Sequence, residues 1–108
     1  MVSVSAFCNK NTMTPHEYLL TCMAEECIEV AQRALKASRF TLTEIQPNQP
    51  LNNSERIMIE YADLLGVMEL MQEQGLLAEP ANLRELIEAK KVKVLTYEDY
   101  SRQLGAVK

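Results

Sequence analysis

Residues 57–71 read IMIEYADLLGVMELM, a run that is apolar at most positions. Apolar side chains at helical spacing predict a helix over about residues 54–74, capped by Asn53 or Ser54 and ended by Gly75. The apolar side chains extend almost all the way around this helix, and a chain of 108 residues is too small to cover it alone. We therefore expect a homodimer that buries the second face in a shared helical bundle, with pairing of dimers into a tetramer left open.

A second long helix is predicted before this run. Thr14 and Glu17 have the spacing of a capping box, and Pro15 fits the first helical position, so the helix should begin at Thr14. Apolar residues then recur at helical spacing, which predicts a helix over about residues 14–39. The segment 41–53 contains two prolines and predicts an irregular connection that is unusually long between helices.

The rest of the chain also has helical spacing. We expect one helix over about residues 81–95 and a short last helix over about 97–104, capped by Thr96 with Asp99 three residues later. No alternation with a period of two persists long enough for a strand. The sequence therefore predicts an all-α fold, a helical hairpin plus C-terminal helices, in a single domain over residues 1–108.

The charge balance and the cysteines narrow the class of protein. The net charge is -4 and no run of five like charges occurs, which argues against a polynucleotide partner. Three cysteines without a CxxC pair suit a reducing compartment. No stretch approaches the roughly 18 apolar residues of a membrane span, and the first residues lack the pattern of a signal peptide. We expect a cytoplasmic protein that does not bind membranes.

Both long helices carry a pair of acids beside their apolar residues. Glu26 and Glu29 are three residues apart on the first helix, and Glu60 and Asp63 repeat this spacing on the second. In an antiparallel hairpin the pairs can converge, and like charges ~4 Å apart near a protein surface repel by about 4 kcal/mol. A cation would hold such a cluster together, and ligands that are all carboxylates favour Mg²⁺ or Mn²⁺ over Zn²⁺. A di-iron site is not expected, because the only histidine, His16, lies at a helix start.

The same acids have a structural alternative. They can pair with Arg33, Lys36 or Arg56, or point into solvent, and a single acidic pair on a helix is usually of this kind. Two such pairs on the apolar sides of consecutive helices favour the metal site.

Two short motifs carry a resemblance to a known family. EECIE at residues 25–29 and EYAD at residues 60–63 resemble the EExxE and ExxD motifs of the MazG-like all-α nucleoside triphosphate pyrophosphohydrolases. The similarity spans roughly residues 15–105. It implies a hydrolase that cleaves a nucleoside triphosphate between the α and β phosphates, releasing the monophosphate and pyrophosphate. It also implies four carboxylate ligands of Mg²⁺, with Mn²⁺ as an alternative: Glu26, Glu29, Glu60 and Asp63.

Neighbouring residues are candidates for catalysis and phosphate binding. Glu25, Glu26 and Glu29 are the catalytic candidates, since a carboxylate not fully committed to the metal can accept the proton of the attacking water. For Glu25, orienting a ligand or pairing with a lysine is equally open. Because the chain is acidic overall, the triphosphate also needs local cations. The candidates lie on the first and third predicted helices and are Lys36, Arg39, Lys90 and Lys93, with a solvated surface position as the alternative for each.

Base recognition and turnover are left open by the sequence. No tryptophan is present to stack a base. The remaining aromatic candidates are more typical of packing, and they are Phe40, Tyr61, Tyr97 and Tyr100. The preferred base and sugar, and the number of metals per site, are therefore not determined. A non-catalytic protein that binds nucleotide or metal for regulation, on the same helical fold, is the alternative function.

Overall fold

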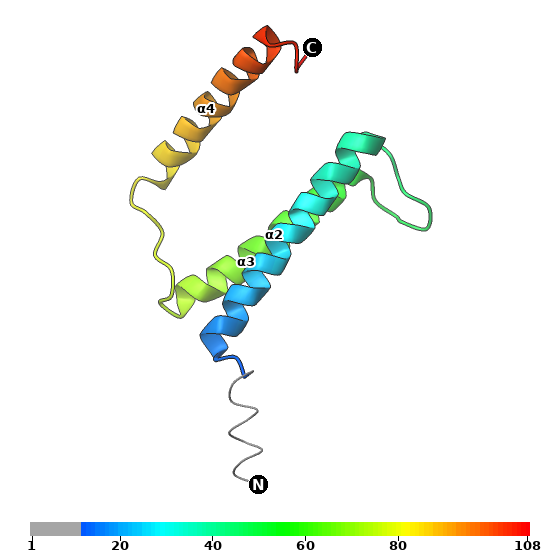
Figure 1. Ribbon diagram of the computed structural model, residues 1–108. Coiled ribbons are helices and arrows are strands. Elements are labelled where there is room, and N and C mark those ends of the chain that lie inside the picture. The colour runs from blue at the N-terminus through cyan, green and yellow to red at the C-terminus, as the bar shows by residue number, and fades with distance from the viewer. Residues whose placement is uncertain (1–11) are drawn as a thin grey trace, which may run out of the picture. The chain divides into compact units, whose positions relative to one another are not determined.

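The computed structural model describes residues 12–108, and these residues form helices without any strand (Figure 1). The helices are α2 (Pro15–Phe40), α3 (Asn53–Glu73) and α4 (Leu83–Gln103). The predicted all-α class is confirmed. The chain divides into one unit that ends at Leu77 and a second unit, Ala78–Lys108, so each is described by itself, and a single domain over the whole chain stays a prediction. None of the helices described is both long and apolar enough to cross a membrane.

The start of α2 has the predicted capping box. Oγ1 of Thr14 accepts a hydrogen bond from the backbone N–H of Glu17 at 3.1 Å, and Oε1 of Glu17 accepts one from the N–H of Thr14 at 3.1 Å. Pro15 begins the helix, where its missing N–H would have no partner in any case. The helix continues to Phe40, after which Thr41 leaves helical geometry with a φ of 80°.

The cap of α3 differs from the prediction. Asn52, rather than Asn53 or Ser54, caps this helix: its side chain accepts from the N–H of Glu55 at 2.8 Å, and Oε1 of Glu55 accepts from the N–H of Asn52 at 3.0 Å. Only Asn52 is followed three residues later by a carboxylate that can complete this reciprocal pair. An arginine and an isoleucine stand at the corresponding positions for the two predicted caps.

Asn53 instead ties the connecting loop to α3. Its side chain is 1% exposed, and Nδ2 donates to the carbonyl of Thr41 at 2.8 Å and to Oε1 of Glu44 at 3.0 Å. Its backbone N–H donates to the carbonyl of Glu44 at 3.0 Å, and the N–H of Ser54 donates to that of Leu42 at 2.9 Å. The beginning of the loop is therefore held against the beginning of α3.

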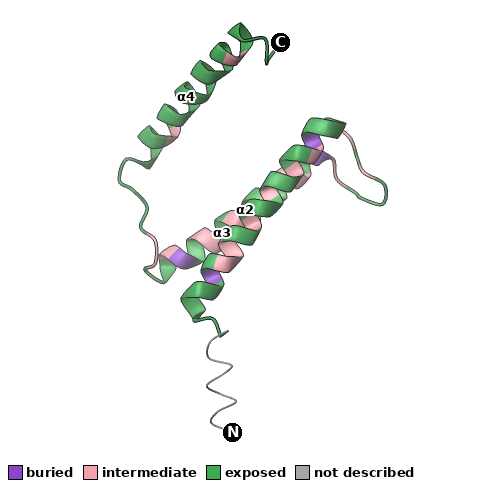
Figure 2. Cartoon of the chain, in the orientation of Figure 1, coloured by how far each residue is buried: buried purple, intermediate pink, exposed green. Residues whose placement is uncertain are grey.

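Helices α2 and α3 lie side by side in opposite directions and form a hairpin (Figure 1). Its buried residues lie near the two ends of the contact, as Figure 2 shows, and are Leu19, Ala37, Asn53 and Met71. Between them the facing side chains are half-buried, and Glu26, Arg33 and Glu60 are among them. We call the contact between α2 and α3 the seam. Charged groups therefore occupy the middle of the seam.

The end of α3 is the predicted stop at Gly75. This glycine has a φ of 75°, and its N–H donates to the carbonyl of Gln72 at 2.9 Å. The N–H of Leu76 donates to the carbonyl of Met71 at 2.9 Å. These two bonds form a Schellman motif, in which a left-handed residue is needed and glycine adopts it without steric cost.

Helix α4 corrects the prediction of two C-terminal helices. It is continuous through Thr96, the residue expected to cap a separate last helix. Oγ1 of Thr96 donates to the carbonyl of Val92 at 2.9 Å, so the hydroxyl is bonded to the preceding turn of the same helix. Neither glycine nor proline lies within the helix to interrupt it, and extending a formed helix costs less than starting a new one. The helix ends before Gly105, which has a φ of 82°.

Candidate metal centre

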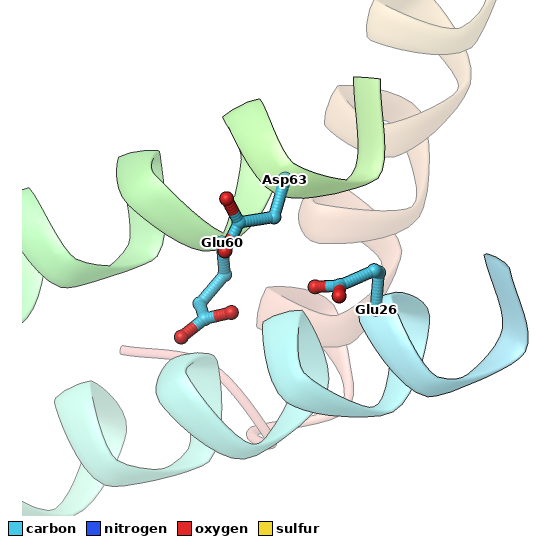
Figure 3. Close-up of side chains that lie close together, drawn as sticks. All are labelled: Glu26, Glu60 and Asp63. Atoms are coloured by element: carbon cyan, nitrogen blue, oxygen red, sulfur yellow. The ribbon is translucent and has the colours of Figure 1, made fainter. Parts of the chain in front are cut away.

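Three carboxylates from two helices gather in the middle of the hairpin. Helix α2 supplies Glu26, α3 supplies Glu60 and Asp63, and one oxygen of each lies within 4.8 Å of the others. Figure 3 shows the side chains directed toward the same space between the helices. We call these residues the acidic triad. The triad brings together three of the four predicted ligands, with members from both acidic pairs.

The helical register accounts for this convergence. Glu26 lies one turn after Met23 and one turn before Val30, and all three are half-buried on the face of α2 that contacts α3. On α3, Glu60 lies one turn before Leu64, and both residues are half-buried. Residues one turn apart share a helix face, so the apolar neighbours that pack in the seam also bring the two glutamates into it.

The carboxyl group of Glu26 lacks a compensating partner. Its Oε2 is buried and accepts no hydrogen bond from the described residues. Burial raises its pKa above the ordinary value, and the charges of Glu29, Asp63 and Glu25 raise it further. A carboxylate in this position favours either a proton or a cation.

The groups around Glu60 shift its pKa in opposite directions. The adjacent carboxyl of Glu29, within hydrogen-bonding reach, raises the pKa of Glu60 most, followed by burial and the charges of Glu29 and Asp63. Arg33 lowers this pKa, and its Nε lies 3.8 Å from Oε1 of Glu60. The pKa is raised overall, so this one ion pair does not cancel the repulsion. Oε2 of Glu60 is buried and, within residues 12–108, has no hydrogen-bond partner.

The two remaining acids of the first motif lie beside the triad. Glu29 is exposed and is not among the carboxylates gathered within 4.8 Å, although it adjoins Glu60. Its role as a fourth ligand stays a prediction. Glu25 is also exposed, and its charge raises the pKa of Glu26. Both acids are therefore close enough to affect the triad electrostatically.

The donors of the triad suit a hard divalent cation. They are all carboxylate oxygens, without the thiols or imidazoles that favour softer metals. Two of the carboxylates have a buried oxygen without a hydrogen bond from the part of the chain that the structure describes. A small divalent cation such as Mg²⁺ usually binds through few carboxylates and keeps positions for water and phosphate oxygens. The residues present therefore fit such an ion.

The predicted phosphate-binding residues are distributed over both units. Lys36 is half-buried on α2, and the guanidinium of Arg39 lies 5.4 Å from the centroid of the Phe40 ring, a cation–π distance. Lys90 and Lys93 are exposed on α4, in the second unit. All four stay predictions as phosphate contacts.

The sequence indicates two arginines near the triad, Arg33 and Arg56, only as ion-pair partners of the acids. Arg33 contacts Glu60, and Nη1 of Arg56 donates to Oε1 of Gln46 in the loop at 2.8 Å. Spacing was the available signal, because Arg33 follows Glu29 by four residues and Arg56 precedes Glu60 by four. Each arginine therefore shares a helix face with an acid of the motifs.

Comparison with known proteins gave no relative, because no family model matches the chain and no curated protein or solved structure matches it significantly. The functional interpretation therefore depends on the two motifs and on the geometry of the triad.

Without metal, the stability of the hairpin should fall as pH rises through the raised pKa values of Glu26 and Glu60. Because both pKa values lie above the ordinary 4.5, the folded state binds more protons than the unfolded chain in that range. The stabilising contribution is present below the ordinary value and is lost as pH rises through the raised values. Thermal melts in a chelator from about pH 4 to about pH 7 should show this loss, and Glu26→Gln should reduce it. Parallel profiles of stability against pH for wild type and Glu26→Gln would contradict the raised pKa of Glu26.

Proposed function

We propose that this protein is a Mg²⁺-dependent nucleoside triphosphate pyrophosphohydrolase that cleaves between the α and β phosphates. The observation that carries the proposal is the convergence of Glu26, Glu60 and Asp63 from consecutive helices. These residues belong to the motifs that resemble those of the MazG-like family. The buried, unpartnered oxygens of the two glutamates support a ligand role over a solvated acidic surface.

The residues of the chain divide into those that hold the ion and those that move a proton. Glu26, Glu60 and Asp63 would hold Mg²⁺, which when bound supplies charge neutralisation for the phosphates and lowers the pKa of a water. Two exposed carboxylates beside them are available to accept the proton of that water: Glu29 next to Glu60, and Glu25 next to Glu26. Arg33 would favour the ionised form of Glu60 and orient its carboxylate through their ion pair.

A screen of the common ribo- and deoxynucleoside triphosphates tests this proposal. With Mg²⁺, at least one nucleotide should yield equal amounts of pyrophosphate and nucleoside monophosphate. A chelator should stop the release, and Asp63→Asn should stop it while the circular dichroism spectrum stays that of a folded helical protein. No release from any nucleotide would contradict the proposal. If nucleotide still bound in that case, the regulatory alternative would be favoured.

Self-association belongs to the same proposal. In the described chain only three apolar residues are buried, whereas large apolar side chains on both helices of the hairpin are exposed. They include Ile28, Leu35, Met58, Ile59 and Leu65. Exposed apolar surface on both helices of a two-helix hairpin is typical of a surface covered in an oligomer. We propose that a second copy of the chain covers it.

Leu65→Lys should therefore weaken the dimer. Wild-type protein should sediment with a mass twice the 12.3 kDa of one chain, and the variant should shift toward monomer because a charge would be buried in the interface. Leu42→Lys, at an exposed apolar position in the connecting loop, is the matched control and should remain dimeric. A wild-type protein that is monomeric by sedimentation velocity at all concentrations would refute the dimer.

A further inference from the structure

A small cleft lies beside the acidic triad, between α2, the connecting loop and the beginning of α3. Its volume is about 150 Å³. It is lined by two arginines, three loop residues, one apolar residue of α3 and one member of the triad: Arg33, Arg56, Gln49, Pro50, Leu51, Ile59 and Glu60. We call it the arginine cleft. Glu60 belongs to both the cleft and the triad, so the two sites are contiguous.

The guanidinium groups in the cleft retain donors that no protein group uses. Nη1 of Arg33 is buried and has no hydrogen-bond partner among the described residues, although Nε of the same side chain faces Glu60. Arg56 uses Nη1 to donate to Gln46 at 2.8 Å. An arginine has five N–H donors, and the contacts with Glu60 and Gln46 involve one donor of each side chain.

These donors and the position of the cleft favour an anionic oxygen ligand. Arginine binds phosphate through parallel N–H···O bonds, and a buried donor without an acceptor is costly until a ligand satisfies it. Arg56 also lies near the N-terminus of α3, where the helix dipole attracts negative charge. Glu60 would repel a bare anion, so the ligand must be one that also neutralises this carboxylate. A phosphate bound to a divalent cation has this property.

The size of the cleft selects which part of a nucleotide can enter. Pockets for drug-sized ligands measure roughly 300–1,000 Å³, whereas this cleft measures about 150 Å³. A nucleoside is therefore too large, and the phosphate end of a nucleotide is the part that fits.

We propose that the arginine cleft binds the terminal phosphates of a metal-bound polyphosphate through Arg33 and Arg56. The identity of that polyphosphate as a nucleoside triphosphate rests on the proposed function. On this basis Arg33 and Arg56 bind the pyrophosphate portion that leaves, and the nucleoside lies outside the cleft. Residues 49–51 of the loop form one wall, which gives the long connection a role in binding.

Isothermal titration with inorganic pyrophosphate and Mg²⁺ tests the cleft directly. Arg56→Met should weaken binding about tenfold or more, since it removes charge-assisted hydrogen bonds to the phosphate. Arg56→Lys should weaken it less, because the charge remains while the planar fork is lost. Gln46→Ala removes the same loop contact of Arg56 but keeps its charge, so this control should bind nearly as wild type.

Several outcomes would overturn the proposal that the arginine cleft binds phosphate. They are the absence of pyrophosphate binding by wild-type protein, unchanged binding by Arg56→Met, and an equal loss in Gln46→Ala, which would assign the effect to loop structure. Turnover separates this proposal from the proposed function. Pyrophosphate binding that depends on Arg56, without nucleotide hydrolysis, would support the phosphate-binding role of the cleft and contradict the proposed pyrophosphohydrolase activity. Nucleotide hydrolysis with an unchanged KM in Arg56→Met would support the activity and contradict the role of the cleft.

A nucleoside triphosphate with a methylene group between the α and β phosphorus atoms distinguishes the two sources of phosphate. Equal weakening of this analogue and of pyrophosphate by Arg56→Met would show that the cleft binds the phosphate chain of the substrate. Weakening of pyrophosphate alone would show that it binds the free product.

Discussion

Replacing Glu26 with glutamine should lower Mg²⁺-dependent pyrophosphate release about 100-fold or more. The substitution preserves the shape of the side chain but removes one anionic ligand from the triad. Charge stabilisation by a bound metal is worth several kcal/mol in a transition state, and each ~1.4 kcal/mol corresponds to a tenfold change in rate. Initial rates at saturating nucleotide, measured for both proteins, would give this ratio.

The same substitution should change stability with opposite signs in the presence and absence of metal. Without metal, Glu26→Gln should be more stable than wild type at neutral pH, because the half-buried side chain no longer carries a charge that burial and the charges of Glu29 and Asp63 disfavour. With Mg²⁺, wild type should gain stability by mass action, and the variant should gain little. Thermal melts in a chelator and in Mg²⁺ measure both effects.

Glu69→Gln is the matched control for this comparison. Glu69 is an exposed glutamate on α3 and is not a member of the triad. Its replacement should change neither the rate nor the response to Mg²⁺. A Glu26→Gln protein that behaves like the control would show that the triad is a solvated acidic surface.

Replacing Asn53 with alanine should destabilise the protein by about 2–4 kcal/mol. Asn53 is buried and donates to the carbonyl of Thr41 and to the carboxylate of Glu44. A neutral hydrogen bond contributes about 1 kcal/mol net and one to a charged group about 1.5–3 kcal/mol. Since small domains are stable by only about 5–15 kcal/mol, this loss is a large fraction of the total. Urea unfolding followed by circular dichroism measures it.

A second asparagine supplies the control for Asn53. Asn82 precedes α4, is exposed and makes no capping hydrogen bond with its side chain. Its replacement by alanine should change stability by less than about 0.5 kcal/mol. Equal effects of the two substitutions would contradict the role of Asn53 in fixing the loop to α3.

Spacing alone predicts the two helices of the hairpin and most of the acidic cluster. The capping box at Thr14 and the stop at Gly75 are local features, and the structure has both. The acids of the triad converge because apolar neighbours one turn away bring Glu26 and Glu60 into the seam. These patterns depend on positions within one helix, and a sequence records such positions directly.

The sequence does not specify features that depend on a choice between competing cap residues or on contacts between helices. The cap of α3 is Asn52 because Glu55 completes its reciprocal pair, a choice among three adjacent polar residues. Thr96 and Asp99 have the spacing of a helix cap, but no glycine or proline before Thr96 ends the helix. The hydroxyl of Thr96 therefore bonds to the preceding turn of the same helix. The sequence indicates Arg33 as an ion-pair partner for these acids, but its contact with Glu60 joins two helices and depends on their register, which spacing within one helix does not specify.

Titration of Mn²⁺ followed by electron paramagnetic resonance tests the metal site most directly. Mn²⁺ prefers the same oxygen ligands as Mg²⁺ and gives a strong signal when free in solution. Adding wild-type protein should reduce the free Mn²⁺ signal, Mg²⁺ should restore it, and Glu26→Gln should reduce it far less. An unchanged free Mn²⁺ signal at every concentration of wild-type protein would contradict a cation site at Glu26, Glu60 and Asp63.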